Sequence, residues 1–133
     1  MSAMQRRKGK AGEQELARLL REHLGIEVSR NLLQAREGGA DLLGVLGWAI
    51  EVKRAVRPSL ASWWQQTCRQ AEDAGERPVL AYRLDRHPWR FVLALRHVAH
   101  GFEHAPLSMQ VETDLEVFAA LVREGVDGTE PHL

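Results

Sequence analysis

Hydrophobic residues recur along the chain at spacings that predict three helices. In residues 11–24 the leucines follow one helical face, and Gly25 stands where a glycine commonly ends a helix. Residues 58–76 predict a second helix, which Gly75 closes. A capping box over residues 113–116 opens the third, which we expect to run through Glu124.

Five apolar segments predict strands. The first covers residues 26–33, and residues 40–46 and 48–54 meet around Gly47 as a hairpin. Residues 78–84 and 89–95 are almost continuously apolar, as strands buried on both faces are. This order predicts an α/β fold with a central mixed five-stranded sheet flanked by helices. We expect one domain over residues 11–125, a mobile basic N-terminal arm at 1–10 and a frayed acidic tail at 126–133.

The charges of the chain are balanced in number but not in position. The 133 residues include 18 Lys and Arg and 18 Asp and Glu. Up to position 100 there are 17 basic and 11 acidic residues, whereas residues 101–133 hold one Arg and seven acidic residues. A net charge of zero therefore does not exclude a nucleic-acid partner, because the basic excess is concentrated in one part of the chain.

Length and composition exclude other classes of protein. The longest uncharged apolar stretch, residues 42–50, is far shorter than the roughly 20 residues that span a bilayer. No apolar segment follows the basic residues near the N-terminus, so we expect no secretory signal and no membrane partner. The single cysteine, Cys68, fits a reducing cytoplasm. No phosphate-binding or dinucleotide fingerprint is present, so no small-molecule cofactor is expected.

Three acidic residues and one lysine form the main candidate site. If the hairpin turns near Gly47, Asp41 lies close to Glu51 and Lys53, which share one face of their strand. Glu13 lies within about 20° of the apolar stripe of its helix. Grouped carboxylates of this kind suit Mg²⁺. The alternatives are a helix-dipole contact for Glu13 and a surface ion pair for Glu51 and Lys53.

Lysine usage favours the functional interpretation. Fifteen of the 18 basic residues are Arg, and Lys53 is the only Lys beyond position 10. A lysine shifts its pKa when desolvated and acts as a compact point charge, whereas arginine stays protonated. Lys53 therefore stands at the candidate site, where the difference between a lysine and an arginine would affect the chemistry.

The series Glu13, Asp41 and Glu51-Val52-Lys53 resembles the PD-(D/E)XK nuclease superfamily. Residues 7–16, 78–82 and 89–92 are further similar to archaeal-type Holliday-junction resolvases and their phage-borne relatives, so the similarity spans about residues 6 to 95. It implies a restriction-endonuclease-like core and a Mg²⁺-dependent DNA endonuclease, with Mn²⁺ as a substitute, in a bacterium or a phage-infected cell. Two departures are notable: Ala40 precedes Asp41 where the motif has proline, and residues 31–39 lack the serine that contributes to cutting in archaeal resolvases.

The resemblance also implies a role for each residue. Asp41, Glu51 and the main-chain carbonyl of Val52 would bind the metal, with Glu13 completing the site. Lys53 would orient water or stabilise the negative charge of the transition state. Gln66 and Gln70 are possible accessory residues, with ordinary surface polarity as the alternative. The residues expected to bind DNA are Arg6, Arg7, Lys8, Lys10, Arg30, Gln34, Arg36, Arg54 and Arg57.

Three functions remain open at this point. A Holliday-junction resolvase acting on branched DNA would be a homodimer with paired active sites. Another phage or mobile-element nuclease of the superfamily would cut flaps, single strands or linear duplex. A non-catalytic DNA-binding module would be expected to have lost one of the four site residues, and none is lost.

Two further groups of residues have open roles. Trp63 and Trp64 cannot both face the core, and the exposed one would stack on a base or lie in an interface. Trp63, Trp64 and the strand near Trp89 are the candidates for a dimer interface. His97, His100 and His104 resemble a zinc site, but no cysteine supports one there.

Overall fold

The computed structural model describes residues 2–34 and 38–125. Six strands form one mixed sheet in chain order, and only β3 and β4 are parallel. The strands are β1 (Ser29–Arg30), β2 (Leu42–Leu43), β3 (Trp48–Ala55), β4 (Arg77–Leu84), β5 (Arg90–Ala94) and β6 (Gln110–Thr113). The helices are α1 (Ala3–Leu24), α3 (Leu60–Ala74), α4 (Leu95–Val98) and α5 (Leu115–Arg123).

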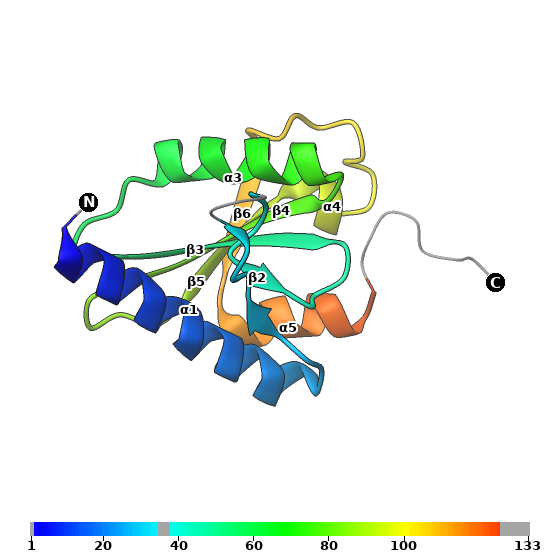
Figure 1. The fold of residues 1–133 in the computed structure, drawn as a ribbon. Helices are drawn as coiled ribbons and strands as arrows, with labels where there is room; N and C mark the ends of the chain where they lie inside the picture. The colour runs from blue at the N-terminus through cyan, green and yellow to red at the C-terminus, as the bar shows by residue number, and fades with distance from the viewer. Residues whose placement is uncertain (1, 35–37, 126–133) are drawn as a thin grey trace.

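Helices cover both faces of the sheet, with α3 on one face and α1 and α5 on the other (Figure 1). The predicted α/β class with a mixed sheet is therefore confirmed, but the sheet has six strands where five were expected. Exposed and half-buried residues alternate along β6. The strand therefore lacks the continuous apolar run by which β4 and β5 were predicted. No described helix is long and apolar enough to cross a membrane.

Strand β3 divides its side chains between two environments. Trp48, Ile50 and Val52 join the core on the α1 and α5 face. The intervening Glu51 and Lys53 point toward the α3 face, because successive strand residues alternate. The strand therefore delivers two charged groups to the side of the sheet that α3 covers.

The predicted hairpin is confirmed. Leu42 pairs with Ile50 in antiparallel register, and the Trp48 N–H donates to the Val45 carbonyl to close the turn. The predicted first strand is shorter than expected and keeps only β1. The Asn31 side chain accepts a hydrogen bond from the Leu33 N–H, which turns the chain away from the ladder.

Residues 3–10, expected to belong to a mobile basic arm, are helical in the structure. Helix α1 already begins at Ala3, because Ser2 and Gln5 form a reciprocal capping box. At the other end of the chain, Asp114, rather than Thr113, caps α5 by accepting from the Val117 N–H. The predicted tail at 126–133 lies outside the described residues.

Candidate active site

A cleft of about 730 Å³ opens between α1, the β2–β3 hairpin and α3. All four residues of the predicted constellation line it, together with both predicted accessory glutamines. The lining residues are Gln5, Arg6, Gly9, Lys10, Glu13, Arg30, Gln34, Asp41, Glu51, Val52, Lys53, Arg54, Ala55, Trp63, Gln66 and Gln70. Residues that are up to 65 positions apart in the chain thus share one cavity.

Asp41 is fixed at the start of β2 by hydrogen bonds to both of its carboxylate oxygens. Its Oδ2 accepts from the Val52 N–H at 2.7 Å, and its Oδ1 accepts from Gln34 Nε2 at 2.6 Å. Its own N–H donates to the Ile50 carbonyl at 3.0 Å. Asp41 is only 5% exposed, so the carboxylate has a defined position against β3.

Glu51 lies beside Asp41 and is also 5% exposed. Burial raises the pKa of Glu51 to about 9, and the Asp41 charge and a hydrogen bond shared with Asp41 add to this effect. The Lys53 ammonium opposes it. Glu51 Oε2 is buried and has no hydrogen-bond partner among the described residues. Two carboxyl groups held together out of water leave an acceptor available for a cation.

Glu13 reaches the cleft from α1 but is held by an arginine. Arg30 Nε donates to Glu13 Oε1 at 2.9 Å. Burial and the Asp41 charge raise the pKa of Glu13, and the Arg30 guanidinium counteracts them. Glu13 lines the cleft from the side of α1 that carries its apolar stripe, and the arginine contact is an addition that sequence periodicity could not supply.

The residues present fit a small divalent cation held by few protein ligands. Among the described residues, no three His, Cys, Asp or Glu side chains are grouped closely enough to hold an ion alone. Mg²⁺ usually keeps several waters and binds through one or two carboxylates. Because the N–H and C=O of one strand residue point to the same side, the Val52 carbonyl faces the side of β3 on which Asp41 lies.

The residues predicted to bind DNA are only partly brought together. Five of them line the cleft: Arg6, Lys10, Arg30, Gln34 and Arg54. Arg7 and Arg57 are exposed outside it. Lys8 pairs with Asp85 at 2.7 Å. Arg36 lies outside the described residues.

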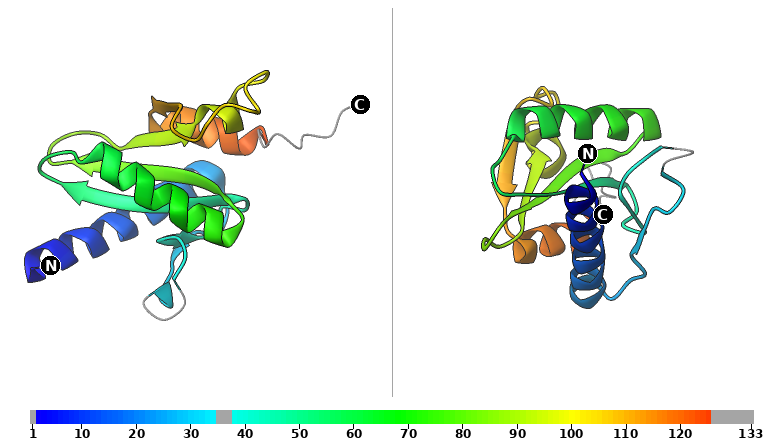
Figure 2. Two further views of the ribbon diagram at one scale, coloured as in Figure 1. Left: turned by 90° about the horizontal axis from the view of Figure 1, so that it is seen from above. Right: turned by 60° about the vertical axis from the view of Figure 1, so that its left-hand side comes forward.

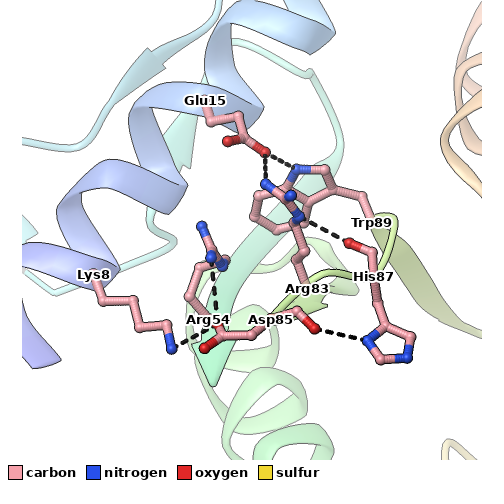
Figure 3. Close-up of polar contacts among 7 residues, drawn as sticks. All are labelled: Lys8, Glu15, Arg54, Arg83, Asp85, His87 and Trp89. Carbon is pink, nitrogen blue, oxygen red and sulfur yellow. Dashed lines mark hydrogen bonds and ion pairs between the residues drawn. The ribbon is translucent and has the colours of Figure 1, made fainter. Parts of the chain in front are cut away.

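Sequence reasoning missed the contacts that hold α1 against the sheet (Figure 3). Glu15 Oε1 accepts from Arg83 Nη1 at 2.7 Å and from Trp89 Nε1 at 2.6 Å. Together with the Lys8–Asp85 pair, these bonds connect two turns of α1 to the end of β4 and to the β4–β5 connection. Glu15 lies off the apolar stripe of its helix, so periodicity gave no signal for its role.

The predicted tryptophan interface needs correction. Trp64 and Trp89 are each 5% exposed, so both are core residues of the chain and are not available to a partner. Trp64 also donates to the Leu107 carbonyl at 2.9 Å. Trp63 is half-buried and lines the cleft.

Two of the three histidines of the suggested zinc site lie in different environments. His97 is half-buried, and burial together with Arg77 and Arg96 lowers its pKa to about 4. His100 is fully exposed and lies 3.5 Å from Glu103.

Comparison with known proteins was made for sequence and for fold. A family model described as Phage putative PDDEXK endonuclease matches residues 4–119. No curated protein matches the chain significantly. Among solved structures, the chain is similar to Archaeoglobus fulgidus Hjc, a Holliday junction resolvase from an archaeal hyperthermophile. The TM-score is 0.54 at 20% sequence identity, over 83% of this chain and 97% of the archaeal one. At this identity the likeness is one of fold.

Proposed function

The chain belongs to the phage PDDEXK endonuclease family, and we propose that it hydrolyses DNA phosphodiester bonds with a divalent metal ion, acting on four-way junctions. The observation that carries this proposal is the buried pair of Asp41 and Glu51 beside Lys53 in one cleft. The raised pKa of Glu51 supports the proposal, because the buried Asp41 and Glu51 pair lacks the positive charge that a metal ion would supply.

Each of these residues has a role in the proposed reaction. Asp41, Glu51 and the Val52 carbonyl would hold Mg²⁺ or Mn²⁺, which when bound polarises the scissile phosphate and lowers the pKa of coordinated water. Gln34 and the Val52 N–H keep the Asp41 carboxylate in place before substrate arrives. Lys53 stabilises the additional negative charge of the transition state.

The role implied for Glu13, which is to complete the metal site through water or a second ion, requires its carboxylate to leave Arg30. In the described structure its carboxylate is neutralised by Arg30. We propose that Arg30 exchanges Glu13 for a DNA phosphate, which would free the Glu13 carboxylate to accept a proton or a hydrogen bond from the attacking water. Both side chains of the pair are partly buried, so the phosphate would have to replace the contact that Arg30 loses.

The preference for junctions is supported by the fold shared with an archaeal resolvase. Cutting a junction symmetrically needs two active sites related by a two-fold axis, so the proposal includes a homodimer. A purely monomeric species by analytical ultracentrifugation at working concentration would remove junction resolution and leave nicking.

The deciding experiment compares an end-labelled four-way junction with a linear duplex of the same sequence. We expect cleavage of the junction in Mg²⁺ or Mn²⁺ and none with chelator. Asp41→Asn and Glu51→Gln should reduce cleavage to background, and Lys53→Met should lower its rate roughly 100-fold or more. Undiminished cleavage by Asp41→Asn would remove the assignment of the site.

The same assay tests a second candidate substrate. The matched family is described as endonuclease without reference to junctions, and residues 31–39 lack the serine of archaeal resolvases. Equal cleavage of flaps, single strands or linear duplex would favour a phage nuclease of broader substrate range.

A further inference from the structure

The two helical walls of the cleft differ in chemistry. The α1 wall carries charged groups, namely Arg6, Lys10 and Glu13. The α3 wall contributes Trp63, Gln66 and Gln70, which are uncharged. Their spacing of three and four residues puts them on one face of the helix. One side of the cleft is thus suited to phosphates and the other to a group that stacks and forms hydrogen bonds.

Trp63 is held in place by the residues beneath it. Its ring centroid lies 5.9 Å from that of Tyr82, with the planes inclined by 47°. The Tyr82 hydroxyl donates to Glu112 at 2.9 Å, and Arg90 pairs with the other oxygen of that carboxylate. The indole therefore rests on a braced aromatic ring and remains half-buried at the cleft surface.

Gln70 adds an unused hydrogen-bonding group on the same wall. Its Oε1 atom is buried and has no hydrogen-bond partner among the described residues. A buried polar atom without a partner is costly in a folded protein and calls for a ligand or a water. An amide beside an aromatic ring is the combination by which proteins hold nucleobases, since the ring stacks and the amide bonds a base edge.

We infer that Trp63, Gln66 and Gln70 form a nucleobase subsite, which takes an unstacked base next to the phosphate that would be cleaved at Asp41 and Glu51. The inference rests on the proposed nuclease function and deepens it by naming the substrate class. A base inside a continuous duplex is covered by its neighbours, so only an unpaired or splayed nucleotide offers its face to Trp63. Branch points, flaps and single strands supply such nucleotides.

A protein partner fits Trp63 less well than a base does. The indole shares its cleft with Asp41, Glu51 and Lys53, so a protein covering it would also close the route to the carboxylates. The other three tryptophans are at most 5% exposed, so Trp63 is also the one that a bound ligand can reach.

The test uses DNA carrying 2-aminopurine, a fluorescent base whose emission falls when it stacks. The probe is placed at the branch point of a junction, and in the control at the same sequence position of a continuous duplex. Binding is measured with chelator present, so that no cleavage is needed. We expect the emission to change on binding of the wild-type protein to the junction and to stay unchanged with the duplex.

Substitutions separate stacking from bulk. Trp63→Leu should weaken junction binding about tenfold, and Trp63→Phe should retain most of it, because a base stacked on an aromatic side chain contributes of this order. Gln70→Met should weaken binding by a smaller factor. Gln65→Ala is the matched control, since Gln65 lies on the same helix but does not line this cleft.

The outcomes distinguish this inference from the proposed function. A 2-aminopurine signal that is absent from the junction complex, or unchanged in Trp63→Leu, would overturn the base subsite even if cleavage is observed. If Trp63→Leu fails to fold, the signal of the wild-type protein still decides. Loss of all cleavage by wild-type protein in Mg²⁺ would instead contradict the nuclease function.

Discussion

At the scale of single residues, the site is governed by two buried carboxyl groups whose simultaneous ionisation is unfavourable. Asp41 receives two hydrogen bonds, whereas Glu51 has a buried oxygen with no partner in the described residues. Ionisation in the folded state is therefore unfavourable mainly at Glu51, whose pKa is raised to about 9. This asymmetry gives a measurable dependence of stability on pH and metal.

Without metal, the wild-type protein should lose stability as pH rises from about 4.5 to 9. Over this range the folded state keeps the Glu51 proton and the unfolded state does not, so unfolding releases it. Glu51→Gln removes that dependence and should be more stable than the wild type at pH 8 by about 1–3 kcal/mol, since one pKa unit corresponds to about 1.4 kcal/mol. Thermal unfolding with chelator at several pH values measures this.

The metal arm of that experiment provides its control. Mg²⁺ should raise the melting temperature of the wild type at pH 8 and leave that of Glu51→Gln nearly unchanged, because ligands stabilise only the state that binds them. A wild-type stability that does not fall between pH 5 and 9 would contradict the assigned environment of Glu51.

Two glycines of α1 offer a second prediction at this scale. A Cβ atom on Gly12 would lie 2.5 Å from Arg54 Cγ, whereas one on Gly9 would meet nothing within 4 Å. Both replacements by Ala gain helix propensity, about 1 kcal/mol each. Gly9→Ala should therefore raise the free energy of unfolding, and Gly12→Ala should lose that gain and displace Arg54.

Urea unfolding of the two variants compares them directly. Weaker DNA binding is also expected for Gly12→Ala, because Arg54 lines the cleft. Equal stabilisation by both replacements would show that the Arg54 side chain does not need the space that Gly12 leaves beside it.

At the scale of elements, α1 positions part of the site although its first turns extend past the sheet. Those turns lie at the end of the sheet where β3 ends (Figure 2). The Lys8–Asp85 pair and the bonds of Glu15 connect α1 to the end of β4 and to the β4–β5 connection. Contacts at Lys8 and Glu15, which come before and after Glu13 in the helix, therefore hold this part of α1 against the sheet.

This arrangement predicts that Glu15 matters more than other acidic residues of α1. Glu15→Ala leaves the partly buried Arg83 and Trp89 donors without their acceptor and should cost about 1–3 kcal/mol. Glu22→Ala, on the same helix, breaks only an exposed pair with Arg18 and should change stability by about 0.5 kcal/mol or less. Chemical denaturation of both variants makes the comparison, and similar losses would contradict the bracing role.

The elements also show which features a sequence can predict. Asp41 could be placed beside Glu51 because a tight hairpin and a two-residue strand period fix which residues lie opposite. The start of α1 could not be predicted, because residues 3–10 have no apolar stripe. Their helix depends on a cap and on a contact with Asp85, which is far along the chain. The exposure of Trp63 could not be predicted either, since helical spacing alone did not determine whether Trp63 or Trp64 is buried.

At the scale of the whole molecule, the segregation of charge follows the order of the sheet. Four of the seven acidic residues after position 100 lie on β6, in α5 or at the caps of α5: Glu112, Asp114, Glu116 and Glu124. Strand β6 is at the edge of the sheet opposite β1 and β2, next to which the cleft opens. DNA approaching the cleft would therefore meet the basic part of the surface, and the acidic part would remain away from it.

This placement predicts how DNA affinity responds to salt. Each phosphate contact steepens the fall of log affinity with log salt concentration by about 0.9. The double variant Arg6→Ala, Lys10→Ala on the cleft wall should reduce the slope by about 1 to 2. Its charge-matched control is Arg18→Ala, Arg123→Ala, which removes two positive charges outside the cleft and should leave the slope nearly unchanged. Fluorescence anisotropy titrations over a series of salt concentrations measure both slopes, and equal reductions would mean that net charge rather than position determines binding.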